Sequence, residues 1–223
     1  DVNNLGMVLK DLGDLKEAKK CFERALKIQE QVYGPDHPTV AIDVNNLGMV
    51  LKDLGDLKEA RKCYERALKI DEKVYGPDHP NVAIMVNNLG MVLRDLGDLK
   101  EARKCCERAL KIFRDMLGED HPNVATMANN IGMVLQAQGD LQEARKCYER
   151  ALKIGEKAYG PDHPNVAIDV NNLGSVLQDL GYLQEARKCY ERALKIFRDK
   201  LGPDHPDTRT VANNLDSLRQ GLK

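Results

Sequence analysis

The sequence predicts an all-α solenoid built from antiparallel helix pairs, and three observations support this fold class. The chain repeats itself every 42 residues, because positions 1–42 and 43–84 differ at only five sites. Within each repeat, apolar residues recur at helical spacing, and Pro and Gly mark where helices begin and end. A fixed period of this kind is typical of a solenoid, in which each repeat buries its apolar face only by stacking on its neighbours.

The first helix of a repeat is predicted over residues 80–96. Its apolar side chains follow one face at a spacing of four, three, four and three: Val82, Val86, Leu89, Leu93 and Leu96. Pro80 suits the first helical turn, where its missing N–H is no loss, and Gly97 suits the left-handed residue that ends a helix. The same signals recur in every repeat.

The second helix is predicted over residues 99–117, ending before Gly118. Asp98 precedes it and Glu101 follows three residues later, which is a capping-box arrangement with Asp in the Ser/Thr place. Its outer face alternates acidic and basic residues at spacings of three and four, as in Glu65 with Lys69. This pattern indicates a solvated face rather than a binding site.

Composition excludes several classes of partner and site. The chain has 34 Lys and Arg against 35 Asp and Glu, a net charge of −1, so neither nucleic acid nor an anionic membrane is expected as the partner. No apolar run is long enough for a membrane-spanning helix. Five of the six cysteines recur at the repeat period, which separates them too far for a disulfide, so we expect small buried side chains in a reducing compartment, the cytoplasm.

The motif residues resemble a known family. Val44, Leu47, Gly48 and Leu51, followed by Ala60, Tyr64 and Ala67, are similar to the tetratricopeptide repeat (TPR) pattern, with Val and Leu at its usual Trp and Tyr positions. The 42-residue period and the segments Asn45–Gly48 and Gly76–Pro80 resemble the long-repeat class typified by kinesin light chain. The resemblance implies a right-handed superhelix whose concave face is lined by the first helix of each repeat.

Residues 1–223 are expected to form a single array of five 42-residue repeats followed by a C-terminal capping helix over residues 206–222. In that last helix Asp216 replaces the repeated Gly and Arg219 replaces a Leu, which would solvate the end of the stack. At the other end, Val2 and Leu5 show no such adaptation. We therefore expect a piece of a longer protein, with end-to-end self-association left open.

The resemblance places the candidate peptide-binding residues on the first helices, where equivalent positions form ladders along the array. These residues are Asn45, Met49, Lys52, Ile84, Asn87, Met91, Arg94, Asn129, Met133, Gln136 and Asn171. Exposed Asn carboxamides could pair with the backbone of an extended peptide, and Met would supply an adaptable apolar floor. The alternative for the Asn ladder is structural: each Asn could bond only to a neighbouring helix.

Other kinds of site are not expected. The TPR domains that clamp terminal carboxylates use Lys residues whose positions here hold Asn45 and Ile84. His37 and its repeats each stand alone in an Asp-His-Pro segment, too far apart to share a zinc ion, and are better explained by helix starts. The sequence contains no phosphate-binding loop or nucleophile motif. We therefore expect no metal, no cofactor and no catalytic site.

Two functions remain after these exclusions. The first is a protein-interaction scaffold that binds an extended segment of a partner in the concave groove, with the partner's identity open. The second is a structural spacer or self-associating module without a dedicated ligand. Near-identity between repeats favours the second, and the changes from Met133 to Ser175 and from Arg94 to Gln136 along the ladders favour the first. An enzymatic role is expected only for another part of the parent protein.

Overall fold

The computed structural model describes residues 1–221, and over that range it contains eleven α-helices and no strand. The helices are α1 (Val2–Asp11), α2 (Leu15–Tyr33), α3 (Pro38–Asp53), α4 (Leu57–Tyr75), α5 (Pro80–Asp95), α6 (Leu99–Leu117), α7 (Pro122–Gln138), α8 (Leu141–Tyr159), α9 (Pro164–Asp179), α10 (Leu183–Leu201) and α11 (Pro206–Gly221). The predicted bounds of α5 and α6 agree with these to within one residue. Of the predicted capping helix 206–222, position 222 lies outside the described residues.

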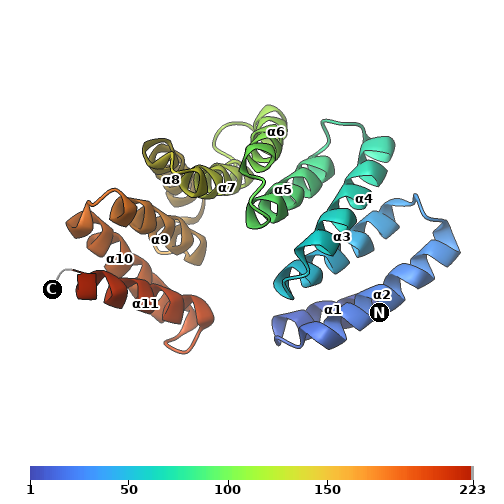
Figure 1. Cartoon of the computed structure of the whole chain (residues 1–223), viewed down its shortest axis with the longest axis horizontal. Helices are drawn as coiled ribbons and strands as arrows, with labels where there is room; N and C mark the ends of the chain where they lie inside the picture. Colours follow the sequence, from blue (N-terminus) through green and yellow to red (C-terminus); the bar gives the residue numbers. More distant parts are fainter. Residues whose placement is uncertain (222–223) are drawn as a thin grey trace. The chain divides into compact units, whose positions relative to one another are not determined.

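The chain divides into two compact units, Asp1–Ile112 and Phe113–Lys223, and each is described by itself. Odd-numbered helices are the first of each repeat and are called A helices; even-numbered helices are the second and are called B helices. Within each unit, successive helices pack side by side as consecutive pairs (Figure 1). This is the predicted all-α, TPR-like arrangement of helix pairs.

A histidine precedes each A helix after α1, whereas Asp1 precedes α1. In α3 the Nδ1 atom of His37 accepts a hydrogen bond from the backbone N–H of Thr39, and in α5 the His79 ring does the same for Asn81 at 3.1 Å. Pro follows at the first helical position. The helix-start explanation of the histidines is confirmed.

A glycine ends α3 as predicted. Gly55 has a φ of 85°, its N–H bonds to the carbonyl of Lys52, and the N–H of Asp56 bonds to the carbonyl of Leu51 at 2.8 Å. This pair of bonds is a Schellman motif, which satisfies carbonyls that the helix leaves open.

The predicted capping box at the start of the B helices is largely wrong. Asp14 accepts a hydrogen bond from the Glu17 N–H, but Asp56 and Asp140 make no side-chain cap bond at the starts of α4 and α8. Asp98 instead lies 3.6 Å from the Arg61 guanidinium of the preceding repeat. Because the Schellman motif sets the path of the chain between α3 and α4, the carboxylate there is free to form ion pairs between repeats.

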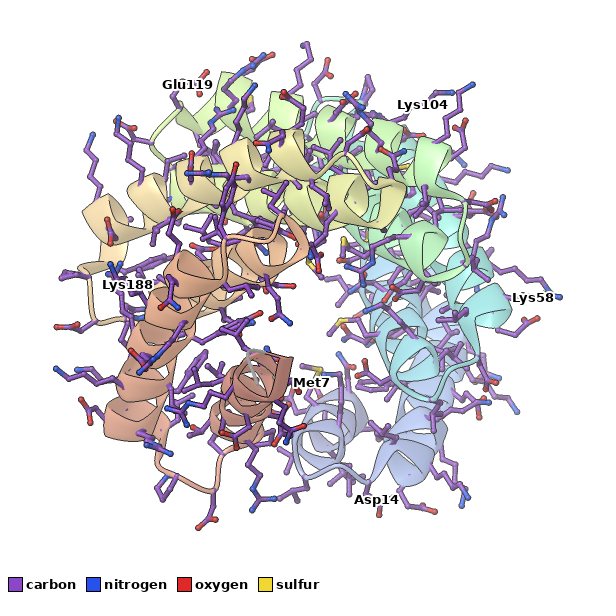
Figure 2. All side chains as sticks on the ribbon, turned by 60° about the vertical axis from the view of Figure 1, so that its left-hand side comes forward. Met7, Asp14, Lys58, Lys104, Glu119 and Lys188 are labelled. Carbon is purple, nitrogen blue, oxygen red and sulfur yellow. The ribbon has the colours of Figure 1, made fainter. Side chains whose placement is uncertain are left out.

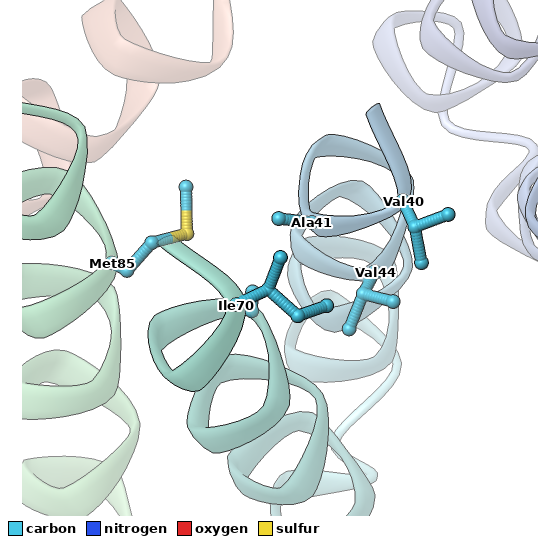
Figure 3. Packing of buried hydrophobic residues seen from close by; sticks show 6 residues of the cluster. Val40, Ala41, Val44, Ile70 and Met85 are labelled. Carbon is cyan, nitrogen blue, oxygen red and sulfur yellow. The ribbon is translucent and has the colours of Figure 1, made fainter. Parts of the chain in front are cut away.

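The core of each unit lies where A and B helices meet. One cluster in the first unit joins Val40 and Val44 of α3 to Ile70 of α4 and Met85 of α5 (Figure 3). Gly132 has no side chain because a Cβ there would lie 2.6 Å from the ring of the buried Tyr148. Helices α7 and α8 therefore approach closely at this glycine.

Position 106 departs from the aromatic pattern. The equivalent residues are Phe22, Tyr64, Tyr148 and Tyr190, whereas Cys106 stands here fully buried. Its Sγ occupies the space beside Gly90, and burial raises the pKa of the Cys106 thiol to about 12. The other five cysteines are half-buried rather than buried as expected, and all six are free thiols. A thiol with a raised pKa is a poor nucleophile.

The last helix carries the two predicted polar replacements on its surface. Asp216 and Arg219 are both exposed, and their side chains pair at 3.4 Å. Elsewhere, exposed charges link consecutive B helices, as in Arg66 of α4 with Glu30 of α2 at 2.6 Å. Pairs of this kind are individually weak.

Candidate peptide-binding surface of the A helices

The Asn residues of the A helices bond to one another between consecutive repeats. The Oδ1 atom of Asn45 in α3 accepts a hydrogen bond from the Nδ2 group of Asn88 in α5 at 2.9 Å. The same bond joins three further pairs at 3.0 to 3.1 Å: Asn46 to Asn3, Asn172 to Asn129, and Asn214 to Asn171. We call this set the asparagine ladder. Each repeat carries two consecutive Asn residues. In each bond the second Asn of one repeat donates to the first Asn of the preceding repeat.

Two of the predicted groove residues are buried. Asn45 is 8% exposed and Asn129 is 7% exposed, so the prediction of exposed carboxamides is wrong for both. The contacts of their Nδ2 groups are long: 3.5 Å from Asn45 to the Asn46 amide oxygen, 3.7 Å from Asn45 to the Met49 sulfur, and 4.0 Å from Asn129 to the Met133 sulfur. The carbonyl end of each amide is therefore engaged in the stack, while the amino end is only weakly bonded. Asn87 and Asn171 are half-buried.

Two methionines line a cavity of about 200 Å³ on the A helices of the first unit. Met49 of α3 and Met91 of α5 share it with Lys10 of α1 and with Lys52 and Asn88. Both methionines are half-buried. The structure thus brings three predicted site residues together and adds four that the sequence analysis did not select: Lys10, Asp53, Tyr64 and Asn88. A signal for Lys10 existed, because it occupies the repeat position of Lys52.

Charged and amide side chains near the ends of the A helices bond along the stack. Lys52 lies 3.7 Å from the carboxylate of Asp95, and Lys10 lies 3.5 Å from that of Asp53. Arg94 pairs with its own neighbour Asp95 at 2.6 Å. These cations are partly neutralised, so the first unit does not present a free basic surface.

Gln136 takes the corresponding place in the second unit. Its Nε2 group donates to the Asp179 carboxylate at 2.6 Å and to the Ser175 hydroxyl at 3.0 Å, and its Oε1 accepts from the Tyr148 hydroxyl. Gln178 accepts likewise from Tyr190, whose pKa is raised to about 12 by burial, which keeps the phenol protonated as a donor. Gln136, which stands at the repeat position of Arg94, therefore bonds the A helix α7 to the B helix of the same repeat, α8.

On the A helices after α1, the exposed large apolar residues share one repeat position. Ile42, Ile84 and Ile168 are 53%, 43% and 41% exposed, respectively. By contrast, the labelled lysines Lys58, Lys104 and Lys188 extend from B helices into solvent (Figure 2). The A helices thus offer apolar and amide groups, and the B helices offer charges.

The asparagine ladder yields a first prediction. Truncating Asn129 to Ala removes the acceptor for Asn172 and leaves a partly buried donor without its partner, so we expect the free energy of unfolding to fall by about 1–3 kcal/mol. Chemical denaturation of the full chain measures this. The exposed Asn165, changed to Ala, is the control, with an expected change within about 0.5 kcal/mol. Equal stability of the Asn129 variant and wild type would contradict a structural role for the ladder.

Among residues 1–221, no group of three or more His, Cys, Asp or Glu side chains is placed to hold a metal ion. No helix in that range has the length and apolarity needed to cross a membrane. Paired helices repeating every 42 residues, bonded repeat to repeat through the asparagine ladder, define a helical-repeat protein of the solenoid class.

Comparison with known sequences identifies the family. Sequence models of the tetratricopeptide repeat match residues 2–39, 39–94, 82–137, 124–165 and 167–216. The chain therefore belongs to the tetratricopeptide repeat family, whose members are generally protein-interaction scaffolds and typically lack catalytic activity. No curated protein matches the chain.

Solved structures with the same fold include TPR arrays of the kinesin-light-chain type. A single-residue variant of a putative kinesin light chain with nearly identical TPR-like repeats, from Podospora anserina, aligns with a TM-score of 0.73 at 22% identity, over 90% of this chain and 94% of that chain. Another structure of that protein gives a TM-score of 0.71 at 23% identity, over 89% and 94%. BtubC (BKLC) from P. vanneervenii aligns with a TM-score of 0.73 at 28% identity, over 92% and 81%.

Proposed function

We propose that the chain binds an extended segment of a partner protein along its A helices and has no catalytic activity of its own. The observation that carries this proposal is the cavity of about 200 Å³ lined by Met49, Met91, Lys10 and Lys52. Methionine packs adaptably against apolar side chains, and Lys10 and Lys52, which pair loosely with Asp53 and Asp95, can also bind carbonyl oxygens of a peptide. The exposed isoleucines offer further apolar contact area on the A helices.

The sequence suggested that whole Asn carboxamides bind the peptide, but we propose that only part of each carboxamide does so. Because Asn45 and Asn129 accept hydrogen bonds from the next repeat, only their amino groups would be available to the carbonyl oxygens of a peptide. We therefore assign most of the proposed affinity to Met49, Met91 and the residues around them. We also propose that residues 1–223 form one array and that the protein is cytoplasmic.

Truncating the methionine floor tests the proposal. Peptides are first selected from a display library against the wild-type chain, and their affinity is then measured for the double variant Met49→Ala, Met91→Ala. We expect affinity to fall at least about tenfold, or about 1.4 kcal/mol, because both side chains line the cavity. The control is Lys58→Ala with Lys188→Ala on the B helices.

The melting midpoint of each variant is recorded alongside its affinity, so that unfolding is not mistaken for lost binding. Unchanged affinity in the Met variant, with a loss in the Lys variant, would move the binding surface to the B helices. A failure to select any peptide would count against the proposal as a whole.

Self-association is the second candidate function, and one observation favours it. On α1, Leu5 and Val8 are 52% and 55% exposed, whereas the equivalent Leu47 and Val50 on α3 are buried. An apolar helix face of this kind could stack on another copy of the chain. Sedimentation of the full chain at increasing concentration tests this, and a monomer throughout the range would exclude it.

A further inference from the structure

A second cavity lies on the A helices of the second unit, and its lining differs from that of its neighbours. It has a volume of about 210 Å³ and is bounded by α7, α8 and α9. Asp169 lies in its wall with Gly155, Asn129 and Ile168. The volume is several times the roughly 30 Å³ that one water molecule occupies in the liquid. We call this cavity the Asp169 pocket.

The carboxylate in this pocket has no partner among the described residues. Asp169 is 8% exposed, and it makes no hydrogen bond or ion pair in that part of the chain. Burial alone raises the pKa of its carboxyl to about 7. A buried acid without a partner is costly, and such groups are concentrated at functional sites. The carboxylate therefore lacks a cationic or hydrogen-bonding group that a ligand could supply.

Gly155 is what leaves this carboxylate accessible. A Cβ at position 155 would lie 3.0 Å from the Oδ2 atom of Asp169. The equivalent residues in other repeats all carry side chains: Gln29, Asp71, Phe113 and Phe197. One repeat further along, the corresponding cavity of about 190 Å³ is lined by Phe197 and Val211 in the places of Gly155 and Asp169. The two places that hold Gly155 and the carboxylate of Asp169 in one cavity are thus filled by apolar side chains in the next.

We propose that the Asp169 pocket binds the ammonium or guanidinium group of a Lys or Arg side chain on the partner segment, an inference that rests on the proposed function of the A-helix surface. The Asp169 carboxylate pairs with the cation, and Ala125 and Ile168 contact its methylene stem. The Tyr159 ring, which stacks on His163, also lines the pocket and can contact the stem. No other lining residue carries a carboxylate.

A small amine tests the pocket without requiring a peptide. The full ¹⁵N-labelled chain is titrated with n-butylammonium at pH 8 and constant ionic strength, and the amide resonance of Gly155 is followed. We expect a saturable shift with n-butylammonium and at least a tenfold weaker response to n-butanol, which has the same stem without the charge. Asp169→Asn should abolish the difference between the two probes.

Asp43→Asn is the matched control for the amine titration. Asp43 is buried at the equivalent repeat position in the first unit, but the residue corresponding to Gly155 there is Gln29. This variant should respond to n-butylammonium as wild type does. An absent Gly155 shift in wild type, an equal response to n-butanol, or an unchanged response in Asp169→Asn would overturn the proposal.

Peptides selected against the wild-type chain separate this inference from the proposed function. We expect them to be enriched in Lys or Arg at one position, and Asp169→Asn to weaken the tightest of them at least tenfold. Selected peptides that bind without such enrichment, and with equal affinity for Asp169→Asn, would overturn the pocket assignment and leave the proposed function standing. Binding of n-butylammonium at Gly155 without any selectable peptide would support the pocket as a cation site and count against the proposed function.

Discussion

Replacing Tyr148 with alanine is expected to lower the free energy of unfolding by about 3–5 kcal/mol, the range typical of removing a large buried aromatic side chain. Tyr148 is 1% exposed, its ring fills the space that Gly132 leaves, and its hydroxyl donates to Gln136. The alanine variant would leave a cavity between α7 and α8 and an unsatisfied amide oxygen. Urea denaturation of the full chain, monitored by circular dichroism, measures the loss.

The matched control for this substitution is Tyr148→Phe. It keeps the ring and removes only the hydroxyl, so the expected loss is about 0.5–1.5 kcal/mol. The chain already tolerates this residue, because Phe22 occupies the equivalent position in the first repeat. Equal stability of the alanine and phenylalanine variants would show that the ring does not hold the helix pair together.

Asp169→Asn is expected to stabilise the protein at neutral and higher pH, by about 2–4 kcal/mol. The folded-state pKa of Asp169 is about 7, above the unfolded value near 3.9, so the folded state binds the proton more tightly. The stability of wild type associated with this group is therefore fully present below pH 4 and is lost as the pH rises through 7. Asparagine remains neutral throughout and avoids this loss.

The measurement is the difference in unfolding free energy between Asp169→Asn and wild type from pH 4 to pH 8. It should lie near zero at the acid end and grow toward pH 8. Asp43→Asn should show the same trend with a smaller gain, because the pKa of Asp43 is raised only to about 6. A difference that is constant with pH would contradict the assignment of a buried, unpaired carboxylate.

The local structure was predictable because its signals are local. Pro80 and Gly97 mark the bounds of α5, and the spacing from Val82 to Leu93 identifies the face that becomes buried. The placing of His79 at a helix start was predictable for the same reason. The capping box was mispredicted at α4 and α8, because an Asp before a helix is only able to cap it, and Asp56 and Asp140 make no side-chain cap bond.

The candidate site was less predictable, because its contacts join residues about one repeat apart. Nothing in the Asn45 segment alone indicates that Asn88 donates to it, and an amide in a polar segment is ordinarily expected to be exposed. Asp169 was overlooked because an acidic side chain on a helix is ordinarily expected to face water. The substitution of glycine for a larger residue at position 155 was the available signal.

The asparagine ladder has a consequence for how such a chain changes in length. Every repeat carries both halves of the bond, because Asn46 donates to the repeat before it while Asn45 accepts from the repeat after it. A gene duplication of one whole repeat therefore inserts a donor and an acceptor together, and no interior carboxamide is orphaned by the event. An insertion of part of a repeat would not supply the two together. Recombination between near-identical segments can thus add or remove repeats while the joint between them is preserved.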